Sequence, residues 1–169
     1  MSPSVDELLA LDVLTLREHT ERAGDAFDVD EHRAKLCKSL EINELCYVRR
    51  DGKLVAYAML RPEAGACWFV GAFGTHPLHR TYTVVNELFA KIATLASERR
   101  IGELRSHVYK TNRLSIAFHR KLGFVVTREK DLSVILWAGH IMRCKSHGYA
   151  DEEEKTNRSA SGSGPRAAA

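Results

Sequence analysis

Two apolar runs constrain the fold of this chain more than any other feature. The run from Leu54 to Leu60 and the stretch from about Ala66 to Thr75 are apolar at nearly every position. Successive side chains of a strand point to opposite faces, so a strand without a polar face must be covered on both sides. We therefore expect a sheet with helices packed above and below it.

Shorter patterns predict the remaining strands. A strand over 46–49 is separated from the first apolar run by Asp51-Gly52, a dipeptide that supplies the positive φ of a tight hairpin turn. Three more strands are predicted over 103–109, 124–127 and 132–137. The expected fold is therefore α/β or α+β, built on one mixed sheet of about six strands.

The first helix is predicted from a capping pattern. Ser4 and Glu7 have the S-x-x-E spacing in which each side chain satisfies a backbone donor at a helix start. This spacing predicts a helix over about 5–22. The segment 11–16 also alternates apolar and polar residues as a strand would, and both interpretations remain open.

A second helix is predicted to begin at Asp30, which can act as its N-cap, and to run to about Leu40. Helical spacing places Ala34, Cys37 and Leu40 on its inward face.

Two later helices follow from apolar residues at helical spacing. They are predicted over about 83–99 and 112–122, and Gly123 fits the left-handed position that often follows a helix. Strand-to-helix junctions thus come after Thr75 and after Tyr109. Ligands of open sheets collect where strand ends meet helix starts, so we expect the chemistry at these junctions.

Length and composition favour a single globular domain. The chain has 169 residues, of which 44% are hydrophobic and 28% charged. We expect one domain over 1–149 and a disordered tail over 150–169, where large apolar side chains are lacking. No window approaches the roughly 18 apolar residues of a membrane span. The first residues are acidic where a secretory signal would be basic, so we expect a cytoplasmic protein without a membrane partner.

The cysteine pattern argues against a metal site. Four cysteines lie far apart without a C-x-x-C pair, and buried thiols are the favoured interpretation. His140, Cys144 and His147 share the segment 138–149, but further convincing ligands are lacking there. We therefore expect a short helix in that segment and no metal.

Basic residues gather between Arg99 and Lys121, where seven Lys or Arg face only Glu103. Such a patch can meet the phosphates of a cofactor or of nucleic acid, or form a solvated surface, and charge alone favours the solvated surface. The strands lack the interleaved exposed aromatics that stack on bases. The sequence therefore does not favour nucleic acid as a partner.

The stretch from Asn112 to Phe124 resembles a known pattern. It is similar to the N-x-x-[AS]-x-x-x-[YH]-x-K-x-G-F stretch of the GNAT superfamily, the acyl-CoA-dependent N-acyltransferases. The strand before it matches in spacing, with Asn112 four residues after Val108, and the resemblance covers roughly 46–137. It implies a mixed, mostly antiparallel central sheet with helices on both faces.

The resemblance also implies an activity. Enzymes of this superfamily move an acyl group, often acetyl, from acetyl-CoA or another acyl-CoA to a primary amine of a small molecule or a protein. His119 stands where the family usually has a tyrosine that gives a proton to the departing thiolate. The unperturbed histidine pKa and nearby cofactor phosphates would favour a charged ring in part of the molecules.

The resemblance places the cofactor's phosphates at the junction after Thr75. The family loop there has the form Arg-x-x-Gly-x-Gly or Ala; this chain keeps Arg80 but has Thr83 and Val85 at the two small positions. The strand end 73–76 would supply backbone donors for the oxyanion. The implied cofactor-binding residues are Phe73, Gly74, Thr75, His76, Arg80, Thr81, Tyr82, Thr83, Val84, Val85, Asn112, Arg113 and Ser115.

The group that deprotonates the amine is left open by the sequence. If the strand over 103–109 alternates, Arg105, His107 and Tyr109 share one face, and either of the last two could look into the acceptor cleft. His76, at the end of its strand, is another candidate.

A different class of function also remains. Because Thr83 and Val85 replace small residues, the chain could instead be an inactive GNAT-like module that binds CoA or a protein partner. The acceptor cannot be identified from the sequence, and a homodimer is one of the assemblies it leaves open.

Overall fold

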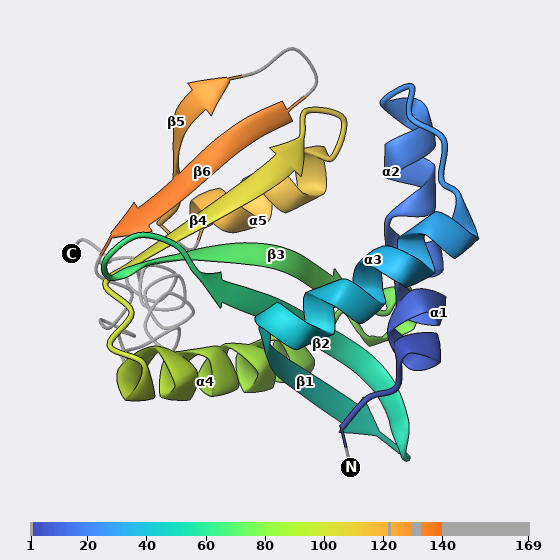
Figure 1. Cartoon of the computed structure of the whole chain (residues 1–169), viewed down its shortest axis with the longest axis horizontal. Helices are drawn as coiled ribbons and strands as arrows, with labels where there is room; N and C mark the ends of the chain where they lie inside the picture. The colour runs from blue at the N-terminus through green and yellow to red at the C-terminus, as the bar shows by residue number, and fades with distance from the viewer. Residues whose placement is uncertain (1, 122, 130–132, 140–169) are drawn as a thin grey trace, which may run out of the picture.

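The computed structural model of the chain describes residues 2–121, 123–129 and 133–139, which form one six-stranded sheet flanked by helices (Figure 1). The strands are β1 (Glu44–Arg50), β2 (Lys53–Pro62), β3 (Cys67–Thr75), β4 (Glu103–Tyr109), β5 (Val125–Glu129) and β6 (Ser133–Gly139). Their order is β1-β2-β3-β4-β6-β5, and only the β3–β4 pair is parallel. The expected mixed, mostly antiparallel sheet is confirmed.

The helices are α1 (Val5–Thr15), α2 (Arg17–Arg22), α3 (Val29–Ile42), α4 (Tyr82–Glu98) and α5 (Arg113–Lys121), with a 3-10 turn, η1 (Pro77–His79), before α4. No described helix is long and apolar enough to cross a membrane. The predicted tail over 150–169 lies outside the described residues.

Two local turn predictions are confirmed. Asp51 and Gly52 join β1 to β2 with φ values of 50° and 76°, so both central residues of this hairpin turn have positive φ. Gly123, after α5, has a φ of 85°. Because L-residues rarely adopt this region, the turn chemistry fixes where these elements end.

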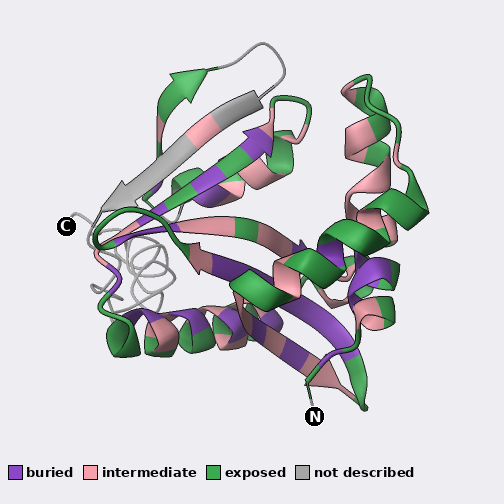
Figure 2. Ribbon diagram, in the orientation of Figure 1, coloured by how far each residue is buried: buried purple, intermediate pink, exposed green. Residues whose placement is uncertain are grey.

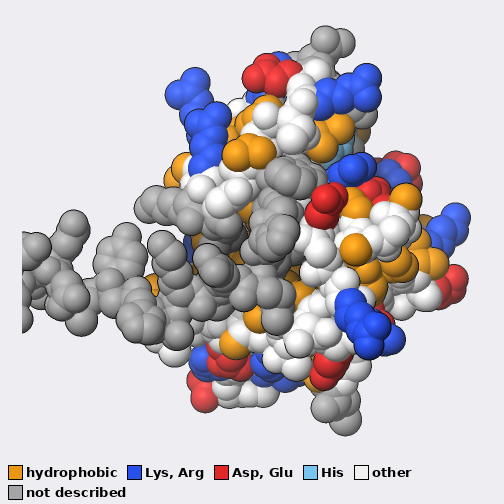
Figure 3. Space-filling model, turned by 90° about the vertical axis from the view of Figure 1, so that its left-hand side faces the viewer, with side chains coloured by type: hydrophobic (Ala, Val, Ile, Leu, Met, Phe, Trp, Pro, Cys, Tyr) orange, Lys and Arg blue, Asp and Glu red, His pale blue; other side chains and the backbone are white. Residues whose placement is uncertain are grey.

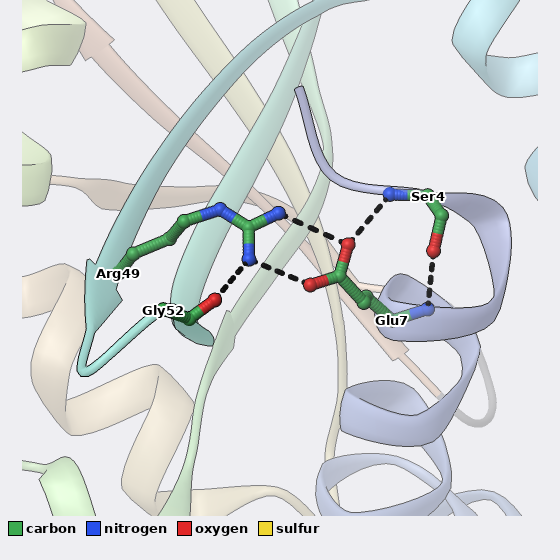
Figure 4. Close-up of polar contacts among 4 residues, drawn as sticks. All are labelled: Ser4, Glu7, Arg49 and Gly52. Carbon is green, nitrogen blue, oxygen red and sulfur yellow. Dashed lines mark hydrogen bonds and ion pairs between the residues drawn. The ribbon is translucent and has the colours of Figure 1, made fainter. Parts of the chain in front are cut away.

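The capping box at the start of α1 is present. Glu7 donates its amide to Ser4 Oγ at 3.2 Å and accepts from the Ser4 amide at 2.9 Å. Figure 4 shows that the same carboxylate accepts from both terminal nitrogens of Arg49, while Arg49 Nη1 also donates to the Gly52 carbonyl at 2.6 Å. These bonds attach α1 to the β1–β2 hairpin.

The predicted first helix is divided into α1 and α2 at Leu16. The segment 11–16 is helical up to Thr15, so the strand interpretation of that segment is wrong. Leu8, Leu9 and Leu11 are buried against the sheet, and this packing favours the helix over local alternation.

The predicted cap of the next helix is wrong, and its predicted inward face is right only for Leu40, which packs against the core. Asp28, and not Asp30, caps α3, because its carboxylate accepts from the Glu31 amide at 2.8 Å. Ala34 and Cys37 are exposed, whereas Leu36 is buried. Burying a leucine removes more apolar area from water than burying alanine and cysteine does, so the leucine decides how the helix is rotated.

Helices cover both faces of the sheet, as the apolar runs predict. Leucines of α1 and α3 pack with Tyr57 and Met59 of β2, and a second cluster joins α4 to the opposite face of β2 (Figure 2). Of the described cysteines, Cys46 and Cys67 are buried as expected, whereas Cys37 is exposed. The core therefore has two layers, one on each face.

The sheet opens between β3 and β4. These strands pair only from Cys67 with Glu103 to Val70 with Ser106, whereas β4 continues along β6 to Tyr109. Beyond Val70 the register of β3 on β2 shifts, which leaves Gly71 as a bulge residue. Figure 1 shows the two strands diverging, and the β3–β4 gap lies between their carboxyl ends.

The basic patch is largely a solvated surface with local ion pairs. Arg99 pairs with Glu44, Arg105 with Glu63, and Lys110 with Glu129. Figure 3 shows acidic side chains near basic ones on one side of the molecule. Ion pairs of this kind weaken the positive potential that would attract a polyanion such as nucleic acid.

Candidate active site

Two cavities meet at the β3–β4 gap. The first, which we call the α3-side cavity, has a volume of about 340 Å³ and is walled by α1, α3, β2, β3 and β4. The second, the α4-side cavity, also has about 340 Å³ and is walled by β3, the starts of α4 and α5, and the α1–α2 junction. The residues that line both are Leu16, Phe73, Asn112 and Ser115.

The α4-side cavity brings together about half of the predicted cofactor residues. Those that line it are Phe73, Gly74, Thr75, Arg80, Val85, Asn112 and Ser115. The sequence analysis missed Thr15, Leu16 and His19, which reach the same cavity from α1 and α2. No local signal could have found them, because they join the site only through the packing of α1 on the sheet.

The start of α4 offers backbone donors. Thr81 is its N-cap: its hydroxyl accepts from the Val84 amide at 3.4 Å, and its carbonyl accepts from the Val85 amide at 3.1 Å. The amides of Tyr82 and Thr83 come before these bonds and belong to the donors that a helix start leaves for a ligand.

Several predicted cofactor residues lie outside both cavities. The side chains of Thr81, Tyr82 and Thr83 are exposed, and Val84 is buried in the core beneath α4. His76 and Arg113 also line neither cavity, and Arg113 is exposed. Of residues 80–85, Arg80 and Val85 line the α4-side cavity, and Tyr82 and Thr83 offer backbone amides.

The carboxyl end of β3 presents alternate amides to the gap. The His76 amide donates to the Val55 carbonyl at 2.8 Å, so it points toward β2. Strand amides alternate in direction, which places the amides of Thr75 and Phe73 on the opposite side. The Thr75 carbonyl, on that side, accepts from Arg80 Nε at 3.3 Å. The predicted donor segment therefore narrows to Phe73 and Thr75.

Gly74 of β3 lies opposite Tyr57 of β2, against the ring of that tyrosine. A Cβ placed on Gly74 would lie 3.0 Å from Cε1 of Tyr57, which is fully buried. Glycine at this position therefore lets Tyr57 pack directly under the strand that carries the gap amides.

Asn112 caps α5 and also lies where the two cavities meet. Its Oδ1 accepts from the Ser115 amide at 3.0 Å, which is the geometry of a helix N-cap for α5. It also lines both cavities. The cap thus fixes the start of α5 against the gap.

His119 lies on α5 and lines the α3-side cavity. The residue is 6% exposed, and its Nδ1 lies 2.7 Å from the Ser115 carbonyl oxygen, so Nδ1 carries a hydrogen. The rings of Phe118 and Phe124 pack edge-on against it. Burial lowers the pKa of His119, an effect that the bond to Ser115 partly opposes. The structure therefore favours a neutral ring, whereas the sequence analysis expected partial charge.

The predicted alternation of β4 is confirmed. Leu104, Ser106 and Val108 are buried, while His107 and Tyr109 lie on the other face and line the α3-side cavity. The Tyr109 hydroxyl donates to Asp25 Oδ2 at 2.9 Å, and burial, followed by this bond, raises its pKa. Tyr109 is thus a neutral phenol at neutral pH and cannot remove a proton from an amine without first losing its own.

The side chain of His76 contacts Leu78 and His79 and lines neither cavity. Its Nδ1 accepts from the Leu78 amide at 3.2 Å, and its ring lies against His79.

Within the described residues, no group of three His, Cys, Asp or Glu side chains could hold a metal ion. The segment with His140, Cys144 and His147 lies outside them.

A partly buried acid-base pair lies in the α3-side cavity and was not predicted from the sequence. Asp12 of α1 and His32 of α3 both line the α3-side cavity, with His32 Nε2 2.8 Å from Asp12 Oδ2. The two residues are 20 positions apart and meet only because α1 and α3 pack side by side.

Solved structures share this fold. The PaiA N-acetyltransferase from Thermoplasma acidophilum, in complex with coenzyme A, aligns with a TM-score of 0.67 at 15% identity over 80% of this chain and 92% of that one. A ribosomal-protein-alanine N-acetyltransferase from Brucella melitensis aligns with a TM-score of 0.56 at 22% identity, over 80% and 94% of the two chains. An aminoglycoside 6'-N-acetyltransferase complexed with coenzyme A gives 0.62 at 12% identity, over 79% and 87%.

The sequence itself carries the family assignment. A comparison with curated proteins gave no match. Residues 10–124, more than half of the chain, match the Acetyltransferase (GNAT) family. This match spans β1 to α5 and includes the gap and both cavities that meet there. The chain belongs to the GNAT family of acetyltransferases.

Proposed function

We propose that this acetyltransferase moves an acyl group, acetyl in the first place, from acyl-CoA to a primary amine on a small molecule or a protein. The observation that carries the proposal is the meeting of two cavities at the β3–β4 gap. Acyl transfer requires two substrates to approach one carbonyl carbon, and here each can enter through its own cavity.

The α4-side cavity fits the donor. Arg80 provides a cation on its wall, and the amides of Tyr82 and Thr83 lie at the positive end of the α4 dipole, which suits a diphosphate. Val85 forms part of the wall and leaves a cavity of about 340 Å³. When bound, the donor supplies an activated acyl group and a thiolate leaving group.

The amides of Phe73 and Thr75 suit the role of oxyanion donors. They point into the gap from a strand that β2 holds in register. Backbone donors on a rigid strand need no rearrangement when negative charge develops, and this is what makes such groups effective in catalysis.

In this proposal His119 transfers one proton from the attacking nitrogen to the departing sulfur. Its Nδ1 is held by the Ser115 carbonyl, so Nε2 is the atom that binds and releases a proton. Because the lowered pKa favours a neutral ring, Nε2 must take up a proton before it can give one. It takes the proton that the attacking nitrogen loses once the C–N bond has formed, and passes it to the departing sulfur.

A binding module without turnover is the second candidate, and the loop residues Thr83 and Val85 favour it. Calorimetry with acetyl-CoA, together with an assay of CoA thiol release over a panel of primary amines, separates the two. Binding with release on at least one amine supports the enzyme. Binding without release on any amine supports a CoA-binding module, and no binding at millimolar acetyl-CoA contradicts the enzyme.

A further inference from the structure

We propose that His32, held by Asp12, is the base that removes a proton from the ammonium form of the acceptor before attack. The inference rests on the proposed function and assigns a step that His119 does not perform. It concerns the α3-side cavity, which would hold the acceptor.

The Asp12 carboxylate is buried on the inner face of α1, where it is 1% exposed. Its two oxygens have separate partners: the Tyr57 hydroxyl donates to Oδ1, and His32 Nε2 lies 2.8 Å from Oδ2. Burial, followed by the charge of Asp12, raises the pKa of Tyr57, so the phenol keeps its hydrogen and donates it. Tyr57 thereby orients the carboxylate toward His32.

This arrangement selects one tautomer of His32. An ionised carboxylate can only accept hydrogen bonds, so Nε2 carries a hydrogen and Nδ1 of the neutral ring has the free electron pair. No described residue gives Nδ1 a hydrogen bond. The His32 side chain is 24% exposed and that of Asp12 only 2%, so the ring opens toward the cavity while its partner stays buried.

The position of His32 places this ring where an acceptor can reach it. It lines the α3-side cavity together with His119 and Phe73, and it also lines an adjoining cavity of about 420 Å³ beneath the α2–α3 connection. A purely structural contact between α1 and α3 would not require the ring to face two cavities. A histidine oriented by a carboxylate and open to a substrate cavity is a general arrangement for proton transfer.

Other charged or titratable groups line the same two cavities as this ring. In the adjoining cavity these are Asp25, Asp28, Glu31, Lys35 and Tyr109. In the α3-side cavity, Arg61, His107 and His119 are added. Lys35 Nζ lies 2.8 Å from Glu31 Oε1, so these two charges largely offset each other. Asp12 remains the acid in direct contact with the ring.

The two proton transfers are distinct. Before attack, an N–H bond of the ammonium breaks and an Nδ1–H bond forms, which gives a free amine and an imidazolium beside the Asp12 carboxylate. After attack, His119 moves the second proton to sulfur. His32 returns its proton to solvent through the cavity, so each turnover releases one acylated amine, one thiol and one proton.

A matched pair of acceptors tests the assignment. A simple alkylamine is an ammonium ion at neutral pH, whereas its trifluorinated analogue is already a free amine and needs no base. In His32→Gln, the amide can still donate to Asp12 but cannot accept the acceptor's proton as a base. We expect kcat/KM at neutral pH to fall about 100-fold for the alkylamine and by about threefold or less for the fluorinated amine.

The pH profile gives a second readout. With the alkylamine, the loss in His32→Gln should shrink as pH rises toward the range in which the amine deprotonates in water. Asp12→Asn should show the same pattern with a smaller loss. Lys38→Gln, an exposed change on α3, should leave both amines and the profile unaltered.

The tautomer can be observed without activity. Nitrogen NMR of the ring should find the hydrogen of neutral His32 on Nε2, and on Nδ1 in a substantial fraction of Asp12→Asn. An equal loss for both amines in His32→Gln, or a hydrogen on Nδ1 in the wild type, would overturn the inference. Failure of the proposed function is distinguishable, because wild type would then release no thiol with either amine.

Discussion

The two faces of the sheet present different kinds of polar group to the β3–β4 gap. On the α4 side, the groups that suit the donor are mostly backbone amides of Phe73, Thr75 and the start of α4. On the α3 side, the groups that can act on an acceptor are side chains, including Asp12, His32 and His107. Backbone groups survive sequence change as long as the fold survives, whereas side-chain groups do not.

The difference between backbone and side-chain groups explains why changes in the phosphate loop leave the start of α4 intact. Thr83 and Val85 replace small residues, yet α4 begins at Tyr82 with its cap in place and the cavity beside it is open. Specificity for the acceptor, in contrast, depends on which side chains α1, α3 and β4 bring to the other cavity. Substitutions on the two sides of the gap test this division.

His119→Phe removes the proton carrier from the α3-side cavity. We expect kcat to fall by about 100-fold or more, because general acid-base groups contribute roughly 10² to 10⁴. Acetyl-CoA affinity, measured by calorimetry, should change little, since the ring lines the α3-side cavity. Burial lowers the pKa of His119, so its ring stays neutral to a lower pH than a free histidine. In wild type, kcat with the trifluorinated amine, which needs no base, should therefore hold until pH drops through that lowered pKa. Equal losses in kcat and in affinity would contradict the assigned role.

Gly74→Ala tests the support beneath the gap amides. The new Cβ would lie 3.0 Å from Cε1 and 3.4 Å from Cδ1 of the buried Tyr57. Overpacking of this kind costs about 1–3 kcal/mol, so the free energy of unfolding, measured with urea, should fall by that amount. Gly102→Ala serves as a comparison, because its Cβ would meet the Cβ of Ala66 at 3.3 Å, outside both cavities. Unchanged stability in Gly74→Ala would show that the ring of Tyr57 can accommodate the added methyl group.

Arg80→Ala removes a cation from the α4-side wall and the bond to the Thr75 carbonyl. We expect acetyl-CoA to bind about tenfold more weakly, in line with the loss of one charge-assisted hydrogen bond. Saturating kcat should stay near the wild-type value. Arg113→Ala, an exposed residue that lines neither cavity, provides the matched control. A larger loss of affinity in Arg113→Ala than in Arg80→Ala would reverse the assignment of the phosphate contact.

Glu7→Gln weakens the attachment of α1, which helps to wall both cavities (Figure 4). The hydrogen bond from Arg49, followed by the Ser4 amide, lowers the pKa of Glu7 to about 2. The contribution to stability is thus present above the usual glutamate pKa and is lost as pH falls toward about 2. The ion pair is partly exposed and screened by solvent. We therefore expect Glu7→Gln to lower the free energy of unfolding by about 0.5 kcal/mol at neutral pH, measured by thermal unfolding. A loss that is unchanged at low pH would exclude the ion pair as its cause.

Local patterns predicted the parts of the fold that depend on local chemistry. The Asp51-Gly52 turn, the β4 alternation and the capping box of Ser4 and Glu7 each follow from residues within a few positions of one another. The inward face of α3 did not, because Leu36 competes with smaller residues for burial and only tertiary packing decides between them.

The residues of the candidate site also differ in whether local sequence or tertiary packing reveals them. His119 could be predicted from its place in a continuous pattern that runs from Asn112 to Phe124. The Asp12–His32 pair could not, because its two members are 20 residues apart on different helices. Tyr57, which binds the same carboxylate, is 45 residues from Asp12. A buried aspartate on an apolar helix face was the one signal available, and it has meaning only once its partners are known.

The central claim is that a donor and an acceptor meet at the β3–β4 gap from opposite cavities. A crystal structure with acetyl-CoA tests it most directly. The account predicts the diphosphate at the amides of Tyr82 and Thr83, the thioester carbonyl within hydrogen-bond distance of the Phe73 or Thr75 amide, and the acyl group directed toward the α3-side cavity. Acetyl-CoA bound elsewhere, or a thioester held away from the gap, would contradict it.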